Sequence, residues 1–362
     1  MNPQEQFCPN PDCAASGREG QIAIHSQKEQ RYRCKQCGRT FTQTTGTAFF
    51  GLKKPHEMFV IVVTLLAYGC PVQAIVVAFG LDERTVWNWL MRSGQQAYKV
   101  HEHLILQGEL DLQQIQADEL KVKTYQGVLW LGLVMMVSTR LWLGGAVDPK
   151  RGKKVLRATL SYAQQSGIAR RVLIAVDGFN IYMEVIPQVF GKTWDWLKAS
   201  WSGWQEVAVV QTMKQRRGKL GQVHRQITWG TPQLVRHLIR ASQKQGWINT
   251  AYIERLNATF RLRLFCLVRC GRALIRQPQT LTDWMWLAGS VYNFCTYHES
   301  LRLALPVSQR RRYWMRRTPA MAAYLTDHCW SVSELMWFKH PPLGWVLSRK
   351  TQGAFPLPRS HA

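Results

Sequence analysis

Acidic residues are scarce in this 362-residue chain, which has 22 Asp and Glu against 47 Lys and Arg. The formal net charge is +25 at pH 7, and the pI is near 10.1. This balance favours a polyanion as partner, with nucleic acid ahead of an anionic membrane surface. Because acids are so few, an acid inside an apolar or strongly basic stretch is informative.

Long hydrophobic runs and a secretory leader are also missing. The first six residues have neither a basic start nor an apolar core. Residues 58–79 are interrupted by Gly69-Cys70-Pro71, and residues 128–147 contain Arg140. Neither stretch reaches the roughly 20 apolar residues of a membrane span. We expect both to be buried core, and we find no P-loop, dinucleotide fingerprint or Ser-His-Asp arrangement.

The cysteines suggest a reducing compartment and a metal. Four of the nine form two pairs, Cys8-x4-Cys13 and Cys34-x2-Cys37, with 20 residues between them. The intervening residues alternate like short strands. Two cysteine pairs on facing turns can form a tetrahedral site with four sulfur ligands, which replaces the core that so small a module cannot build. The pattern predicts structural Zn²⁺ in a zinc ribbon over residues 1–45.

Residues 55–100 are predicted to form a helix-turn-helix DNA-binding domain. Two helices, residues 71–79 and 83–92, flank Gly80-Leu81-Asp82, and Asp82 is a plausible N-cap of the second helix. Gly80 and Val86 fall where this motif needs its turn glycine and its contact between helices. The side chains expected to face DNA are Arg84, Thr85, Asn88 and Arg92.

The pattern changes near residue 110 to alternating strands and helices. A three-strand meander, then a helix and a buried strand, is how the ribonuclease H-like fold begins. The predicted strands cover residues 112–123, 128–138, 140–148, 171–176 and 206–212. The predicted helices cover residues 150–167, 179–190, 231–246, 250–270 and 280–300. We therefore predict a multidomain protein whose α/β ribonuclease H-like catalytic domain, with a mixed sheet, spans residues 110–305, and whose basic C-terminal extension spans residues 306–362.

Two of the scarce acids are set by predicted strands: Asp118 lies within residues 112–123, and Asp177 directly follows residues 171–176. Asp118 shares a face with apolar neighbours, whereas Glu119 shares the other face with lysines, so we expect Asp118 toward the core and Glu119 in solvent. Asp177 ends an apolar run typical of a strand buried on both faces. The carboxyl end of such a strand is the usual position of a site in an open α/β sheet. For any single acid, a helix cap or an ion pair is the ordinary explanation.

Glu254 is the third such acid. It is the single carboxylate among 14 Lys and Arg between residues 207 and 282. Clustered carboxylates repel one another unless cations neutralise them. Two Mg²⁺ or Mn²⁺ ions would do so, and they would also activate an attacking oxygen and stabilise a leaving oxygen in phosphodiester displacement. We therefore predict that Asp118, Asp177 and Glu254 are catalytic metal ligands, with the choice between Asp118 and Glu119 left open.

The chain resembles bacterial insertion-sequence transposases of the DDE class, in the IS-one-like group that carries an N-terminal zinc ribbon and helix-turn-helix. The resemblance extends to about residue 305. It rests on the paired cysteines with Cys34-Lys35-Gln36-Cys37-Gly38-Arg39-Thr40-Phe41, on Ala117-Asp118-Glu119-Leu120, on Val176-Asp177-Gly178-Phe179-Asn180, and on Asn249-Thr250-Ala251-Tyr252-Ile253-Glu254-Arg255-Leu256-Asn257. The last motif is the most specific.

This resemblance implies a function, a site and partners. The ribbon and the helix-turn-helix would bind terminal inverted repeats, and the triad of acids would hydrolyse a phosphodiester and transfer the freed 3′-hydroxyl to target DNA. Arg255 and Asn257 are expected to contact DNA beside the triad. A homodimer or higher oligomer on double-stranded DNA, no membrane partner, and a nucleoid-associated location in the bacterial cytoplasm are further expectations.

Two other functions stay open at this point. A ribonuclease H-like nuclease or resolvase that cuts without joining shares the site chemistry. A non-catalytic regulator built on the ribbon and the helix-turn-helix would explain residues 1–95. It gives no reason for the three acids.

Overall fold

The computed structural model describes residues 2–4, 6–10, 12–191, 193–195, 200–202, 204–217, 220–243, 246–267, 275–305 and 313–339, with only the backbone of 193–195, 200–202, 214–217 and 220–221. Contacts divide the chain into two compact units, Met1–Ile61 with Trp330–Ala362, and Val62–Cys329. The four domain ranges given above stay predictions. Much of the expected C-terminal extension, residues 306–312 and 340–362, lies outside the described residues.

The first unit begins with a small antiparallel sheet in the order β1-β2-β3. The strands are β1 (Ile22–Ser26), β2 (Arg31–Cys34) and β3 (Thr40–Thr42). Its apolar centre is small: the rings of Tyr32 and Phe41 stack with centroids 5.7 Å apart, and the remaining buried side chains are mostly cysteines. So little apolar area calls for further stabilisation, for which bound metal is the usual means in a module of this size.

A segment from the far end of the chain completes this unit. Helix α10 (Val332–Trp337) follows the strands by almost 300 residues of sequence. The backbone N–H of Ala48 donates to the carbonyl of Met336 at 3.1 Å. The ring of Trp337 stacks on Phe49 with centroids 4.3 Å apart. The two ends of the chain therefore form one folding unit, which no local sequence pattern had suggested.

Three helices follow the ribbon, α1 (His56–Ala67), α2 (Val72–Phe79) and α3 (Glu83–Leu104), and the last two are the predicted pair. Gly80 ends α2 with φ 59°, a left-handed conformation that glycine adopts without strain. The carboxylate of Asp82 accepts from the backbone N–H of Thr85 at 3.3 Å and so caps α3. The predicted turn and N-cap are confirmed, because both depend only on local backbone geometry.

Helix α3 is longer than predicted, with 22 residues. Its second half packs along α8 (Pro278–Cys295). At Gly94 an added Cβ would lie 2.3 Å from the carbonyl oxygen of Asp283, so glycine is what permits the two backbones to approach. The hydroxyl of Ser290 donates to the carbonyl of Ala97 at 3.2 Å, one turn further on. Packing against α8 therefore stabilises the second half of α3, which the local sequence pattern did not predict.

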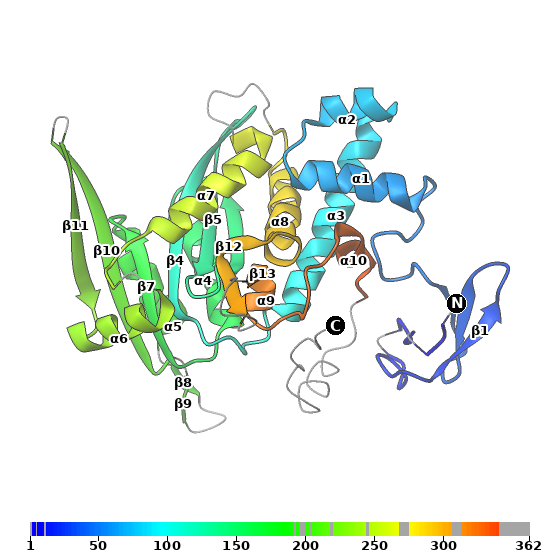
Figure 1. Cartoon of the computed structure of the whole chain (residues 1–362), viewed down its shortest axis with the longest axis horizontal. Helices are drawn as coiled ribbons and strands as arrows, with labels where there is room; N and C mark the ends of the chain where they lie inside the picture. The colour runs from blue at the N-terminus through cyan, green and yellow to red at the C-terminus, as the bar shows by residue number, and fades with distance from the viewer. Residues whose placement is uncertain are drawn as a thin grey trace. The chain divides into compact units, whose positions relative to one another are not determined.

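A six-stranded mixed sheet forms the centre of the second unit, in the order β11-β10-β7-β4-β5-β6 (Figure 1). Strands β4, β5 and β6 form an antiparallel meander, β4 pairs with β7 and β7 with β10 in parallel, and β11 returns antiparallel to β10. The strands are β4 (Gln113–Thr124), β5 (Gly127–Met136), β6 (Trp142–Asp148), β7 (Arg171–Asp177), β10 (Glu206–Arg217) and β11 (Leu220–Trp229). The predicted mixed sheet is confirmed.

Helices cover both faces of this sheet. One face carries α4 (Lys153–Ser166) and α5 (Ile181–Phe190), and the other carries α6 (Pro232–Ser242), α7 (Ala251–Arg263) and α8. Because both faces are covered, strand residues are buried whichever face they point to, and residues 172–176 of β7 are all buried. None of the helices in the described part of the chain has the length and apolarity needed to cross a membrane.

Several elements differ from the predicted ranges. Helix α7 ends at Arg263 and is followed by a short 3-10 turn (Phe265–Leu267), and residues 268–270 of the predicted helix lie outside the described part. A hairpin of β12 (His298–Leu305) and β13 (Tyr313–Arg317) was not predicted. Strands β8 (Thr193–Asp195) and β9 (Ser200–Ser202) and the short helix α9 (Pro319–Ala322) are likewise additions.

Candidate active site

A cavity of about 570 Å³ opens where strands β4 and β7 separate. The two strands pair in parallel as far as Gln116 and Ala175. Asp118 and Asp177 each lie two residues beyond that last pair, in the same direction, so the two acids flank the opening between the strands. Both line the cavity, and so does Glu254 from α7. The structure thus brings together three acids that are 59 and 77 residues apart along the chain.

Asp118 is held by two hydrogen bonds. One carboxylate oxygen accepts from the backbone N–H of Glu119 at 2.8 Å, and the other accepts from the side-chain amide of Asn257 at 2.7 Å. Burial raises the pKa of Asp118 to about 6, and repulsion by Glu119 and Asp177 adds to this. A carboxylate in this position is stabilised in its charged form by any cation that enters the cavity.

Asn257 does not have the exposure expected of a DNA contact. Its side chain is only 2% exposed, and its amide is engaged with Asp118. The expectation that it contacts DNA is therefore corrected. Asn257 lies on the inward side of α7, one turn after Glu254, and orients the first acid of the cavity. Arg255, the other residue expected to contact DNA from this helix, is exposed.

The position of α7 is set by a glutamine on β4. The buried side chain of Gln116 donates to the carbonyl of Asn249 at 2.7 Å and accepts from the backbone N–H of Ile253 at 2.9 Å. Ile253 lies in the first turn of the helix, where N–H groups have no partner within the helix. Gln116 therefore joins the strand of Asp118 to the helix of Glu254. No clear signal for this role exists in the sequence, because β4 contains three glutamines, and sequence reasoning missed it.

Glu119 is buried, contrary to the expectation that it lies in solvent. It is 8% exposed because α4 and α5 cover its face of the sheet. The hydroxyl of Tyr182 donates a short hydrogen bond to its carboxylate, and Arg151 donates from Nε at 2.9 Å. Burial raises the pKa of Glu119, and these two partners oppose that rise. Glu119 is not among the residues that line the cavity, whereas Asp118 is.

The predicted DNA-binding residues of α3 occupy its N-terminal half. Arg84 and Asn88 are exposed, and Thr85 and Arg92 are half-buried. Val86 and Trp89, between them in sequence, are buried. This alternation leaves an exposed polar face on the second helix of the pair. The roles of these residues in DNA recognition stay predictions.

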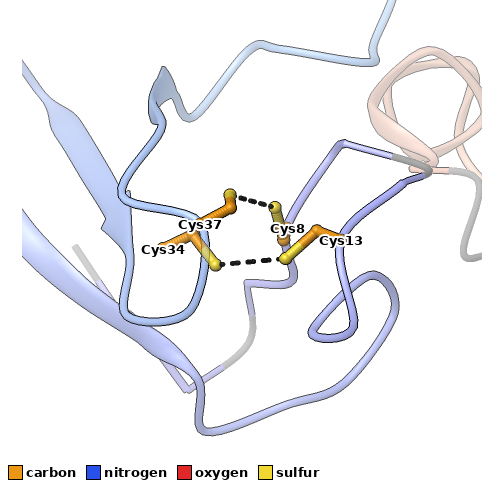
Figure 2. A group of neighbouring side chains, drawn as sticks. All are labelled: Cys8, Cys13, Cys34 and Cys37. Carbon is orange, nitrogen blue, oxygen red and sulfur yellow. Dashed lines mark hydrogen bonds between the residues drawn. The ribbon is translucent and has the colours of Figure 1, made fainter.

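The four paired cysteines converge at the start of the first unit (Figure 2). Their sulfur atoms all lie within 4.8 Å of one another, with 3.6 Å between Cys8 and Cys37 and 3.8 Å between Cys13 and Cys34. Four thiolates around Zn²⁺ with Zn–S bonds of about 2.3 Å are separated by about 3.8 Å, so the group fits a tetrahedral zinc site. Within the described residues no other group of three or more potential ligands is this close, so the acids of the cavity are more widely spaced.

Comparison with known proteins adds little. No protein-family model matches the chain, and no curated protein does. Among solved structures, a chain of the simian T-cell lymphotropic virus intasome in complex with the PP2A regulatory subunit B56 gamma is similar over 74% of this chain and 74% of its own length, with 11% identity and a TM-score of 0.30. A similarity this distant carries no argument about function.

Proposed function

We propose that this protein is a DNA transposase of the DDE class, which binds the terminal inverted repeats of an insertion sequence and carries out metal-dependent strand cleavage and strand transfer. One observation carries the proposal: Asp118, Asp177 and Glu254, taken from three distant segments, line a single cavity. An acid that only caps a helix or pairs with a neighbouring base has no reason to meet two others. The scarcity of acids in the chain makes the coincidence less probable still.

The sheet supports the assignment to a ribonuclease H-like catalytic domain. An antiparallel meander followed by two parallel strands, in the order β6-β5-β4-β7-β10, is the arrangement expected of that fold. The first acid lies on the first strand of the meander, the second at the end of the next parallel strand, and the third on a later helix. Asp118 rather than Glu119 is the first acid in this proposal, because only Asp118 lines the cavity.

The residues of the cavity suit hard divalent cations. They offer carboxylate oxygens, which Mg²⁺ and Mn²⁺ prefer, and their wide spacing suits two ions rather than one. When bound, such ions would neutralise the acids, activate an oxygen nucleophile and stabilise the leaving oxygen. The chain's own part is positional: Asn257 orients the Asp118 carboxylate, and Gln116 holds the helix of Glu254 against β4.

The ribbon and the paired helices would supply DNA binding. We propose that Zn²⁺ on Cys8, Cys13, Cys34 and Cys37 holds the ribbon folded, and that the exposed face of α3 reads the ends of the element. Phosphate contacts by a chain with a formal charge of +25 should make affinity fall steeply between about 50 and 200 mM salt. Arg84→Ala and Asn88→Ala should weaken binding to end DNA more than binding to random DNA. Lys99 is exposed on the same helix, and Lys99→Ala should change the affinity for end DNA and for random DNA by the same factor.

Incubation with Mg²⁺ or Mn²⁺, terminal DNA of the element and a target plasmid tests the catalytic proposal. Glu254→Gln should reduce strand-transfer products by about a thousandfold. The matched control is Glu206→Gln, which removes the same charge from an exposed acid at the other end of the sheet. Cleavage without joining in the wild type would indicate the nuclease. Binding to end DNA without any metal-dependent chemistry would indicate the regulator.

A further inference from the structure

Arg151 brings a positive charge into the acidic cavity. Its Nη2 lies 2.8 Å from a carboxylate oxygen of Glu119 and 3.2 Å from one of Asp177, so a single guanidinium bridges the two acids. The guanidinium carbon lies 4.0 Å from the centre of the Phe179 ring and 5.3 Å from the Trp130 ring. Arg151 also lines the cavity, and the proposed function assigns it no role.

The two ends of this bridge differ in burial. The Glu119 side chain is fully buried. Its carboxylate lies within 2.9 Å of two Arg151 nitrogens and also accepts a hydrogen bond from the Tyr182 hydroxyl. The Asp177 side chain is 41% exposed and receives one Arg151 nitrogen at the longer distance. A buried carboxylate cannot lose its cation without a large desolvation penalty, whereas an exposed one is re-solvated. The contact with Asp177 is therefore the weaker end of the bridge.

The loop that carries Arg151 is fixed on its own. The Asp148 carboxylate accepts from the backbone N–H of Lys150 at 2.9 Å and pairs with Lys154 at 3.2 Å. These contacts flank Arg151 on both sides in sequence. The guanidinium is thus placed by its loop, by Glu119 and by the Phe179 ring, and it does not depend on Asp177 to stay near the cavity.

We propose that Arg151 is a resident counter-ion of this cavity, anchored by Glu119, and that a divalent cation must displace its contact with Asp177 in order to bind there. The proposal rests on the proposed function, because Asp177 is there a metal ligand. Two cations cannot share one carboxylate closely without repulsion, and the guanidinium is the one that can withdraw, since Glu119 still holds it. Glu119 and Arg151 are positioning residues in this scheme. Their effect is to keep the acids neutralised until the metal arrives.

The test measures the affinity of the purified full-length protein for Mn²⁺ without DNA, by the paramagnetic resonance signal of free Mn²⁺. Arg151→Gln should bind Mn²⁺ roughly tenfold more tightly than the wild type, which is the effect of removing one adjacent like charge. Arg151→Gln alone leaves Glu119 buried without its cation and endangers folding. The double variant Glu119→Gln/Arg151→Gln avoids this and also leaves the net charge unchanged. It should still bind Mn²⁺ more tightly than the wild type, but by less than tenfold, because the Arg151 contact no longer has to be broken while the attraction of the Glu119 charge for Mn²⁺ is also lost.

Two control variants separate this inference from the proposed function. Lys153→Gln removes a positive charge two residues away that pairs with Glu184 outside the cavity, and it should leave Mn²⁺ affinity unchanged. Asp177→Asn should abolish the tight Mn²⁺ binding. Unchanged binding in Asp177→Asn would overturn the metal site itself and with it the proposed function. Loss of binding in Asp177→Asn, with unchanged or weaker affinity in the folded double variant, would overturn the counter-ion role alone.

Discussion

The substitution Gln116→Leu isolates the link between the strand of Asp118 and the helix of Glu254. Leucine has nearly the same size as glutamine but makes no hydrogen bond. The change would remove the 2.7 Å bond to the Asn249 carbonyl and the 2.9 Å bond from the Ile253 N–H. Losing a buried partner costs about 1–3 kcal/mol per group, and two groups lose theirs, so the packing of α7 on β4 should be weakened by about 2–6 kcal/mol. The matched control is Gln114→Leu, two residues earlier on the same strand face.

Gln114 is buried like Gln116, but its bond goes to Ser242 of α6, at 2.6 Å, and its side-chain nitrogen has no partner. Gln114→Leu therefore removes one bond, leaves α7 attached and relieves an unsatisfied group, so we expect a cost of about 1 kcal/mol or less. Both variants replace a buried glutamine by leucine. Gln116→Leu removes the bonds to α7 and to Asn249, which precedes it, and Gln114→Leu removes the bond to α6. Only one of those helices carries a proposed metal ligand.

Native-state hydrogen exchange on the full chain measures the local effect. A loss of 2 kcal/mol corresponds to about thirtyfold faster exchange. We expect at least that in α7 for Gln116→Leu, and little change there for Gln114→Leu. Metal-dependent DNA cleavage should fall by about a hundredfold in Gln116→Leu alone, since a displacement of about 1 Å in a catalytic group has that effect. Equal exchange in α7 for the two variants, or wild-type cleavage by Gln116→Leu, would refute the positioning role.

Three further predictions concern the rest of the molecule. Cys34→Ser should lower bound zinc, measured by elemental analysis, and weaken end-DNA binding while α7 keeps its hydrogen-exchange protection; full zinc content would contradict the four-sulfur site. Burial raises the pKa of Asp283 to about 6, so the folded state holds this proton more tightly than the unfolded state, and stability falls as pH rises from about 4 to about 6. Asp283→Asn removes this pH dependence. The difference in unfolding free energy between the variant and the wild type should therefore rise by about 2 kcal/mol between pH 4 and 7.5, at about 1.4 kcal/mol per pKa unit. Urea unfolding that gives the same difference at both pH values would refute this prediction. Trp337→Ala removes the ring stacked on Phe49 and should speed hydrogen exchange in β1–β3, with no change in the six-stranded sheet; unaltered exchange in the ribbon would show that α10 does not stabilise it.

Much of the secondary structure followed from local rules. Alternation and apolar runs predicted β4, β5, β6, β7 and β10 to within a few residues, except that β10 continues to Arg217. That extension pairs with β11 alone, since pairing with β7 ends at Thr212. A strand whose partner is the next strand of a hairpin has no need of apolar faces. The residues of β10 beyond Thr212 are mostly polar or basic, so alternation could not set the length of the strand.

The candidate site residues could be named from the sequence, but their contacts and burial are known only from the fold. Paired cysteines at close spacing and rare acids in apolar or basic stretches can be recognised in the sequence, because close cysteine pairs suit a metal and a carboxylate is costly to bury without a partner. The different environments of Asp118 and Glu119 could not be predicted from the sequence pattern. Strand alternation places the two on opposite faces, but only the packing of α4 and α5 decides that the face of Glu119 is closed. The same packing supplies Tyr182 and Arg151 as its partners.

The sequence by itself determined the two cysteine pairs, the strand that ends at Asp177 and the charge of the chain, because the first two are patterns over a few residues and the third is a sum over the composition. Only the tertiary structure decided that Gln116 fastens α7, that Arg151 bridges two acids, and that α10 returns to the N-terminal unit. These contacts join residues 26 to 288 positions apart. The pairing of such distant groups is set by which buried polar atoms need partners when the layers close, and that need exists only once the chain has folded.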